Sequence, residues 1–183
     1  MLLTFCEWLE STPWSIALHE SLYAYPLIET THVLSLMLFV GSVVFVDARL
    51  LGWTLRDVPV STVTARLLPW TAAGFVVATV TGALLFYAIP VRTYLSIFFR
   101  IKAAMLVVGG LNALLFHRRV HSREVSWDAD PVPPLRARVT GAVSMFTWAT
   151  VIVTGRMIAY NWFDCDRQPQ PDLVNWLAGC PLP

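Results

Sequence analysis

The stretch TYLSIFFRIKAAMLVVGGLNALLFH, Thr93–His117, predicts a membrane-spanning helix because it is long and apolar enough to cross a bilayer. A helix needs about 20 residues to cross a hydrocarbon layer roughly 30 Å thick. The stretch also holds Lys102, the single lysine of the chain, whose other cationic side chains are twelve arginines. An ammonium group at mid-membrane costs about 2.5–3.5 kcal/mol on insertion scales. We therefore expect a partner that offsets this cost.

Three further segments have the same character. The chain of 183 residues is 56% hydrophobic with a mean hydropathy of +0.61, against about 45–50% apolar residues in soluble domains. The expected spans are residues 26–51, 67–89, 94–116 and 139–163. The sequence therefore predicts an all-α four-helix transmembrane bundle in contact with membrane lipid. We expect no nucleic-acid partner for such a chain.

Arginines predict the orientation of the bundle. The loops after the first and third spans are rich in them: Arg49, Arg56, Arg66, Arg118, Arg119, Arg123, Arg136 and Arg138. The first 25 residues contain neither Lys nor Arg, and the tail after the fourth span contains only Arg167. By the positive-inside rule, we expect both termini on the outer side, which is the periplasm for a protein of the bacterial inner membrane.

Two terminal segments flank the expected spans. Residues 1–25 are rich in Trp, Phe and Leu, which is typical of an amphipathic helical segment that lies in the membrane interface. Pro13 is expected at a first helical position, where it divides this segment. Residues 164–183 form a periplasmic tail, in which Cys165 and Cys180 either form a disulfide or stay as free thiols.

Three spans place a polar side chain at nearly the same depth. At 1.5 Å per residue, His32 lies roughly 9 Å inside the outer end of its span, Lys102 roughly 12 Å and Arg156 roughly 10 Å. Glu29 shares a helical face with His32. Ionisable groups within a membrane usually face the bundle interior. We therefore expect a polar layer in the outer third of the bundle, and a hydrogen-bonded clasp of Asp47, Arg49 and Asn112 at its inner end.

Two interpretations of the outer layer stay open. In the first, His32 is an axial ligand of a haem b between the helices. The haem propionates then pair with Arg156, Arg100 or Lys102, and His19 is a candidate second ligand. In the second interpretation, Glu29 neutralises a cation of the layer, His32 forms a nearby hydrogen bond, and no cofactor is present.

The same residues carry two resemblances. Most of the chain resembles an uncharacterised family of bacterial four-helix membrane proteins, through the stretches HESLYAYPLIETTH, VGSVVFVDARLLG, TGALLFYA, FRIKAAMLVVGGLNALLFH and WATVIVTGRMIAY. More distantly, the arrangement of spans and polar residues resembles that of HemJ-type protoporphyrinogen oxidases and CopD-like membrane domains. His32, the Arg49-Leu50 pair and the stretch Phe99–Lys102 match the HemJ-type pattern, although RLLGWT lacks the further histidine of that pattern. The resemblance implies a bound haem, with His32 and Lys102 as the functional pair.

We therefore expect a membrane protein with one b-type haem near the periplasmic face. Its expected role is electron transfer to a quinone or a periplasmic redox partner, as a single protein or as a subunit of a membrane redox complex. The alternative is a non-enzymatic structural or accessory subunit of a larger membrane complex. Copper handling would favour an external motif rich in Met or His, which the sequence does not contain.

Overall fold

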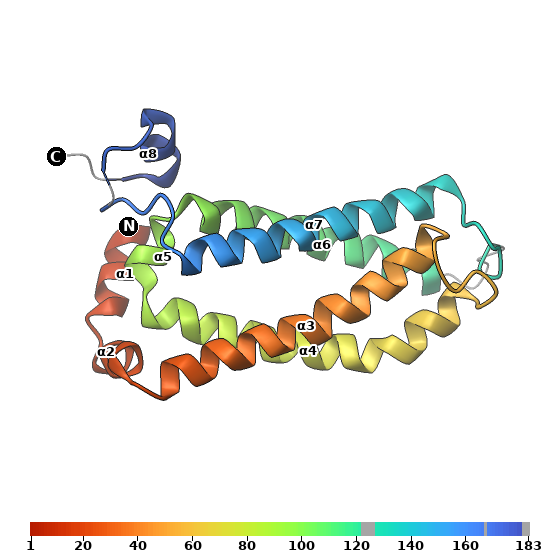
Figure 1. The fold of residues 1–183 in the computed structure, drawn as a ribbon, viewed down its shortest axis with the longest axis horizontal. Coiled ribbons are helices and arrows are strands. Elements are labelled where there is room, and N and C mark those ends of the chain that lie inside the picture. Colours follow the sequence, from red (N-terminus) through yellow and green to blue (C-terminus); the bar gives the residue numbers. More distant parts are fainter. Residues whose placement is uncertain (122–126, 167, 181–183) are drawn as a thin grey trace.

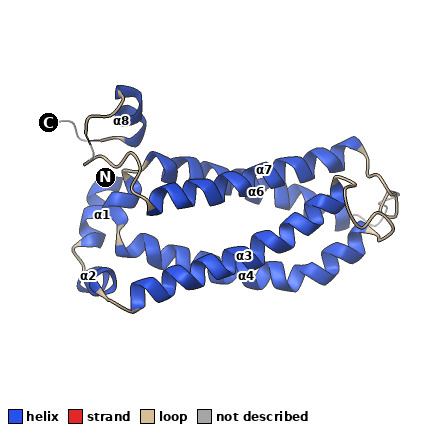
Figure 2. Cartoon of the chain, in the orientation of Figure 1, coloured by secondary structure: helices blue, strands red, loops and turns tan. Residues whose placement is uncertain are grey.

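The computed structural model describes residues 1–121, 127–166 and 168–180, and this part of the chain is helical with no strand (Figure 2). Four long helices run side by side: α3 (Ala24–Leu50), α4 (Val60–Ala88), α6 (Ile97–His121) and α7 (Leu135–Ala159) (Figure 1). Each contains a segment long and apolar enough to cross a membrane. The prediction of a four-helix transmembrane bundle is confirmed.

The helix ends differ from the expected spans for local reasons. Helix α4 begins directly after Pro59, well before residue 67. Its first turns, up to Arg66, are helical although they are less apolar than the expected span. A short helix, α5 (Pro90–Tyr94), takes up the start of the third expected span, so that α6 begins only at Ile97. Helix α7 ends at Ala159 rather than residue 163, because Asn161 has a φ of 57°, a left-handed conformation that does not continue a helix.

The bundle consists of two helix pairs. Helix α3 packs along α4, helix α6 packs along α7, and the pairs meet through α3 and α7. A Cβ on Gly74 of α4 would lie only 2.8 Å from the Phe39 backbone nitrogen, so the first pair is closely packed. The Phe39 ring also meets the Trp148 ring of α7 edge-on, with centroids 4.6 Å apart. Together with Val40 and Val151, these rings form the core that joins the pairs at mid-bundle.

The end of the bundle that carries the α3–α4 and α6–α7 loops is fastened by a fully buried arginine. Arg49 donates hydrogen bonds to the carbonyl oxygens of Val58 (2.7 Å) and Asp130 (2.9 Å), which lie in the two connecting loops. The Asn112 amide instead donates to the Thr140 carbonyl across the α6–α7 contact, at 3.1 Å. Buried Asp47 packs its backbone against Gly141. The expected clasp is therefore three separate attachments between helices and loops.

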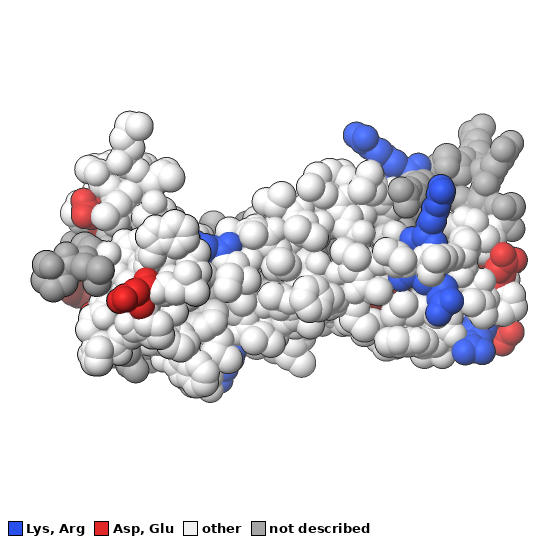
Figure 3. Space-filling model, turned by 90° about the horizontal axis from the view of Figure 1, so that it is seen from above, with Lys and Arg blue, Asp and Glu red and all other residues white. Residues whose placement is uncertain are grey.

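The N-terminus lies at the other end of the bundle, together with α1 (Leu2–Glu10), α2 (Pro13–Glu20), α5 and α8 (Asp172–Ala178) (Figure 1). Thr12 caps α2, with Pro13 at a first helical position as expected, and Ser15 fastens α2 to α4 by donating to the Tyr87 carbonyl at 2.8 Å. Basic side chains gather mainly at the loop end (Figure 3). Arg123 and Arg167 lie outside the described residues.

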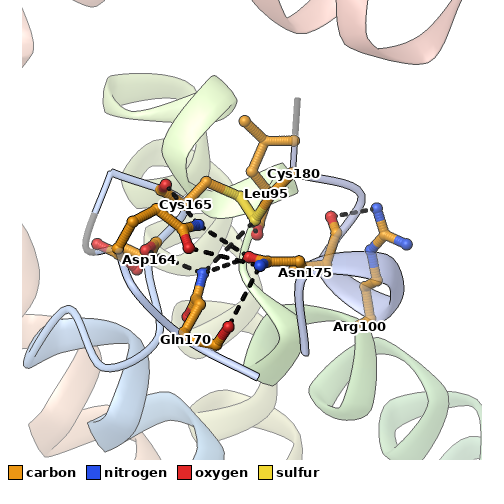
Figure 4. Close-up of a disulfide and its surroundings, with 9 residues drawn as sticks. Leu95, Arg100, Asp164, Cys165, Gln170, Asn175 and Cys180 are labelled. Atoms are coloured by element: carbon orange, nitrogen blue, oxygen red, sulfur yellow. Dashed lines mark hydrogen bonds between the residues drawn. A yellow bond between two sulfur atoms is a disulfide. The ribbon is translucent and has the colours of Figure 1, made fainter. Parts of the chain in front are cut away.

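The C-terminal segment is a closed loop rather than an extended tail. Cys165 and Cys180 form a disulfide, so this expected pairing is present in the structure (Figure 4). The loop is fastened to α5 by an ion pair of 3.0 Å between Arg92 Nε and Asp164 Oδ2. Among the described residues, this is the one side-chain ion pair.

Candidate functional site

His32 is held between the helices of the first pair. It is half-buried on α3, and its Nδ1 lies 2.9 Å from the Thr81 Oγ1 of α4. Thr81 is itself buried, and its hydroxyl donates to the Val77 carbonyl one turn earlier, at 2.7 Å. The imidazole is therefore attached to the neighbouring helix through one nitrogen.

This arrangement determines which nitrogen of His32 carries the proton. A hydroxyl group has one hydrogen to donate, and that of Thr81 is directed to the Val77 carbonyl. We therefore infer that Thr81 Oγ1 accepts in its contact with His32 and that Nδ1 is the donor. In the neutral ring, Nε2 carries the free lone pair. A histidine fixed in this way is prepared to bind a metal ion or a proton through Nε2.

Lys102 approaches the same region from the second helix pair. It is half-buried on α6 and lies within electrostatic range of His32. Among the residues that the structure describes, its Nζ makes no hydrogen bond and no ion pair. From the sequence, Glu29 was one candidate to neutralise a cation of this layer. Within the described part of the chain, Lys102 and Glu29 form no ion pair. An ammonium group in a membrane-length helix is left without a partner there.

Two glycines adjoin these side chains. A Cβ on Gly82 of α4 would lie 3.1 Å from His32 Cε1, and a Cβ on Gly155 of α7 would lie 3.5 Å from Lys102 Nζ. The four residues come from the four long helices, one from each. The small residues let the functional side chains lie between the helices. We call His32, Thr81, Lys102 and the two glycines the outer site.

Two arginines expected in this layer make other contacts. Arg156 is exposed on α7, where its guanidinium lies 4.6 Å from the Tyr160 ring centroid and donates to the Tyr160 hydroxyl at 2.8 Å. Arg100 donates to the Ala178 carbonyl of α8 at 2.6 Å. Depth along a helix placed both residues near His32, but the rotation of each helix directs these side chains elsewhere.

His19 and Glu29 also stay apart from the outer site. His19 is exposed at the end of α2, and its ring meets Tyr25 edge-on with centroids 6.1 Å apart. Glu29 is half-buried one turn before His32 and forms no ion pair with any described residue. Of the six residues singled out from the sequence, His32 and Lys102 lie within electrostatic range of each other, with no hydrogen bond or ion pair between them in the described part of the chain.

The outer site offers two nitrogen atoms that could bind a metal, Nε2 of His32 and Nζ of Lys102. Within the described ranges, no three His, Cys, Asp or Glu side chains gather as a metal site. A haem supplies four equatorial nitrogens of its own, so one or two protein ligands suffice. His32 Nε2 is such a ligand, and Lys102 offers either an amine or a cation for an acidic group.

Thr81 and Gly82 were not singled out from the sequence. A threonine in an apolar span is common and usually bonds to its own helix, as Thr79 does with the Phe75 carbonyl. The signal that could have identified the pair is the adjacency of a polar and a small residue in the stretch TVTGALL. That Thr81 and Gly82 lie next to His32 follows only from the packing of α3 against α4.

Comparison with known proteins gives one match. The family model described as "Family of unknown function (DUF6644)" matches residues 5–161. No curated protein and no solved structure matches the chain.

Proposed function

The chain belongs to DUF6644, a family of unknown function, and we propose that it is a membrane haem protein with His32 as an axial ligand. The observation that carries this proposal is the position of the His32 imidazole, whose Nδ1 lies 2.9 Å from Thr81 Oγ1. Haem-ligating histidines bind iron through one ring nitrogen while the other donates a hydrogen bond. His32 has this arrangement, with Nε2 left for the ligand.

Lys102 supports the same proposal through its lack of a partner. A cation in a transmembrane helix is normally paired with an acid or directed into a polar cavity. No described residue pairs with Lys102. A haem offers two ways to satisfy it, since its carboxylates accept hydrogen bonds from a cation and its iron accepts a neutral amine.

The residues of the outer site fit the donor set that a b-type haem needs. His32 supplies a ligand of defined tautomer, and Gly82 and Gly155 keep side-chain bulk away from His32 and Lys102. A haem bound there would supply one-electron transfer. The outer site lies in the half of the bundle nearer the termini, and we propose that this half faces the periplasm of a bacterial inner membrane. The electron partner would then be a quinone or a periplasmic redox protein.

The alternative is an accessory subunit whose polar layer only pairs charges. It requires partners for Glu29, Lys102 and Arg156, and none of these residues forms an ion pair with another described residue. The contacts within the chain therefore favour the haem proposal. A second subunit that supplied the missing charges would restore the alternative.

Optical spectroscopy tests the proposal. We expect the protein, purified in a mild detergent, to show reduced-minus-oxidised bands of a b-type haem, either as isolated or after haem is added. His32→Ala should abolish these bands or change their position. His19→Ala is the matched control, because His19 is exposed at the membrane surface, and it should leave the spectrum unchanged. A colourless protein that takes up no haem would refute the proposal.

A further inference from the structure

Helix α8 exposes its large apolar side chains and buries a polar one. Asn175 and Ala178 are buried, at 4% and 0% exposure, while Trp176 is 75% exposed. Leu173 and Leu177 are also exposed. A helix on a water-soluble surface buries its apolar face. The outward face of α8 therefore needs an apolar neighbour.

The inner face of α8 is held by polar contacts that fix its rotation. The Asn175 side-chain oxygen accepts hydrogen bonds from both Gln168 and Gln170 at 2.8 Å (Figure 4). The disulfide of Cys165 with Cys180 closes the loop around this amide cluster. Because Asn175 has its partners inside, α8 cannot turn its apolar face inward without losing them.

The end of α8 is attached to α6 of the bundle by a hydrogen bond from Arg100. Arg100 of α6 donates to the Ala178 carbonyl at 2.6 Å, where a cation is favoured by the helix C-terminus. The next residue, Gly179, has a φ of +73°, and a Cβ there would lie 2.8 Å from Arg100 Nη2. Arg100 precedes Lys102 by two residues on a membrane-length helix. This attachment holds α8 at the level where α6 begins.

The surroundings identify the neighbour as lipid. Helix α8 lies at the same end of the bundle as α1 and α2, beside the pair of α6 and α7 (Figure 1). Other large aromatic side chains are exposed at this end, among them Trp8, Trp14 and Trp162. Tryptophan concentrates at the headgroup level of membranes. The spanning helices that α8 adjoins are themselves surrounded by lipid, so the apolar face of α8 continues a lipid-facing surface.

We propose that α8 is an interfacial membrane anchor, with Leu173, Trp176 and Leu177 inserted in the leaflet on the side of the termini. The disulfide, the amide cluster and the Arg100 bond present this face to the bilayer. The inference concerns the C-terminal segment alone and does not depend on haem binding.

Tryptophan quenching in phosphatidylcholine vesicles tests the anchor. The emission of Trp176 is obtained as the difference between the wild-type protein and Trp176→Phe, each reconstituted in the same vesicles. We expect a lipid brominated near the headgroup end of its chains to remove most of this difference emission. Aqueous iodide should remove little of it.

A second variant keeps the reporter while weakening the anchor. Leu173→Ser with Leu177→Ser should reduce quenching of Trp176 by the bromolipid and increase quenching by iodide. A thiol assay on the denatured protein should confirm that the disulfide is intact in this variant. Two results would overturn the proposal: quenching of wild-type Trp176 by iodide alone, which indicates a tail in water, and quenching by neither agent, which indicates a covering protein.

Discussion

His32 of α3 and Thr81 of α4 are joined by a hydrogen bond of 2.9 Å in which the imidazole is the donor, because the Thr81 hydroxyl gives its hydrogen to the Val77 carbonyl. The bond fixes both the ring orientation and the tautomer of His32. It also joins two transmembrane helices at a point where each presents a polar group. This relationship makes His32 the most specific candidate ligand in the bundle.

Thr81→Val tests whether that bond positions His32. The substitution nearly keeps the side-chain volume but removes the acceptor, so His32 can turn or change tautomer. Loss of such a supporting bond typically weakens metal binding by about 10–100-fold, and we expect haem affinity to fall by a similar factor in a titration. Thr81→Ser should retain most of the affinity.

Thr79→Val is the matched control for this substitution. Thr79 is exposed on the same helix, and its hydroxyl bonds only to the Phe75 carbonyl. Haem affinity should be unchanged in this variant. Equal losses in the two variants would show that Thr81 acts through helix stability rather than through His32.

Lys102→Met should separate stability from function. The charge costs about 2.5–3.5 kcal/mol at mid-membrane, and no described residue pairs with it. We therefore expect the haem-free variant to melt no earlier than the haem-free wild type, by circular dichroism in detergent. The haem spectrum or the midpoint potential should change in the same variant. A lower melting temperature with no spectral change would instead favour the accessory-subunit alternative.

Gly74→Ala should force α3 and α4 apart. The new Cβ would lie 2.8 Å from the Phe39 nitrogen and 3.0 Å from its Cα, both backbone atoms that cannot turn aside. Overpacking of this kind costs about 1–3 kcal/mol, measurable by unfolding in mixed micelles.

Gly41→Ala on α3 is the control, since nothing lies within 4 Å of its Cβ. Alanine is favoured over glycine inside a helix by up to about 1 kcal/mol, so this variant should be as stable as the wild type or more stable. Destabilisation by both substitutions would mean that helix packing at Gly74 is not the cause.

Arg49→Ala should loosen the loop end of the bundle. Arg49 is fully buried and bonds to carbonyl oxygens of both connecting loops. A hydrogen bond to a charged group contributes about 1.5–3 kcal/mol, so we expect a marked loss of stability and faster proteolysis between residues 51 and 59. Arg66→Ala, at an exposed position of α4, should change stability by about 0.5 kcal/mol or less.

Cys6 should react slowly with maleimides in the native protein. Burial first, and then Glu10 and Glu7, raise the pKa of this thiol above its ordinary value of 9.0. The thiolate is the reactive form, so labelling should be slow near neutral pH and fast once the protein is denatured. Cys6→Ser gives the background, because Cys165 and Cys180 are paired. Rapid labelling of the native protein near neutral pH would contradict the burial of Cys6 in α1.

The raised pKa of Cys6 also gives the sign of a stability change with pH. The folded state holds the thiol proton more tightly than the unfolded state does. Stability from this group is therefore present below the ordinary pKa and is lost as pH rises above it. Cys6→Ser should remove this alkaline component of the unfolding free energy.

The four helices and the depth of their polar residues could be predicted from the amino-acid sequence alone. Within a membrane, the backbone must satisfy its hydrogen bonds internally, so an uninterrupted apolar length specifies a helix. The rise per residue then places His32 and Lys102 at similar depth. Both properties are local to one helix, and neither requires knowledge of its neighbours.

Which of these residues lie close together depends on how the helices pack against one another. Arg156 and Lys102 were expected at similar depths, yet Arg156 lies against Tyr160, while Lys102 Nζ lies beside Gly155 of α7 and within electrostatic range of His32. The rotation of each helix follows from contacts between helices, such as that of Gly74 with Phe39. The pairing of Thr81 with His32 and the outward apolar side chains of α8 depend on the same kind of contact. Such contacts join residues far apart in the chain, so no local pattern in the sequence encodes them.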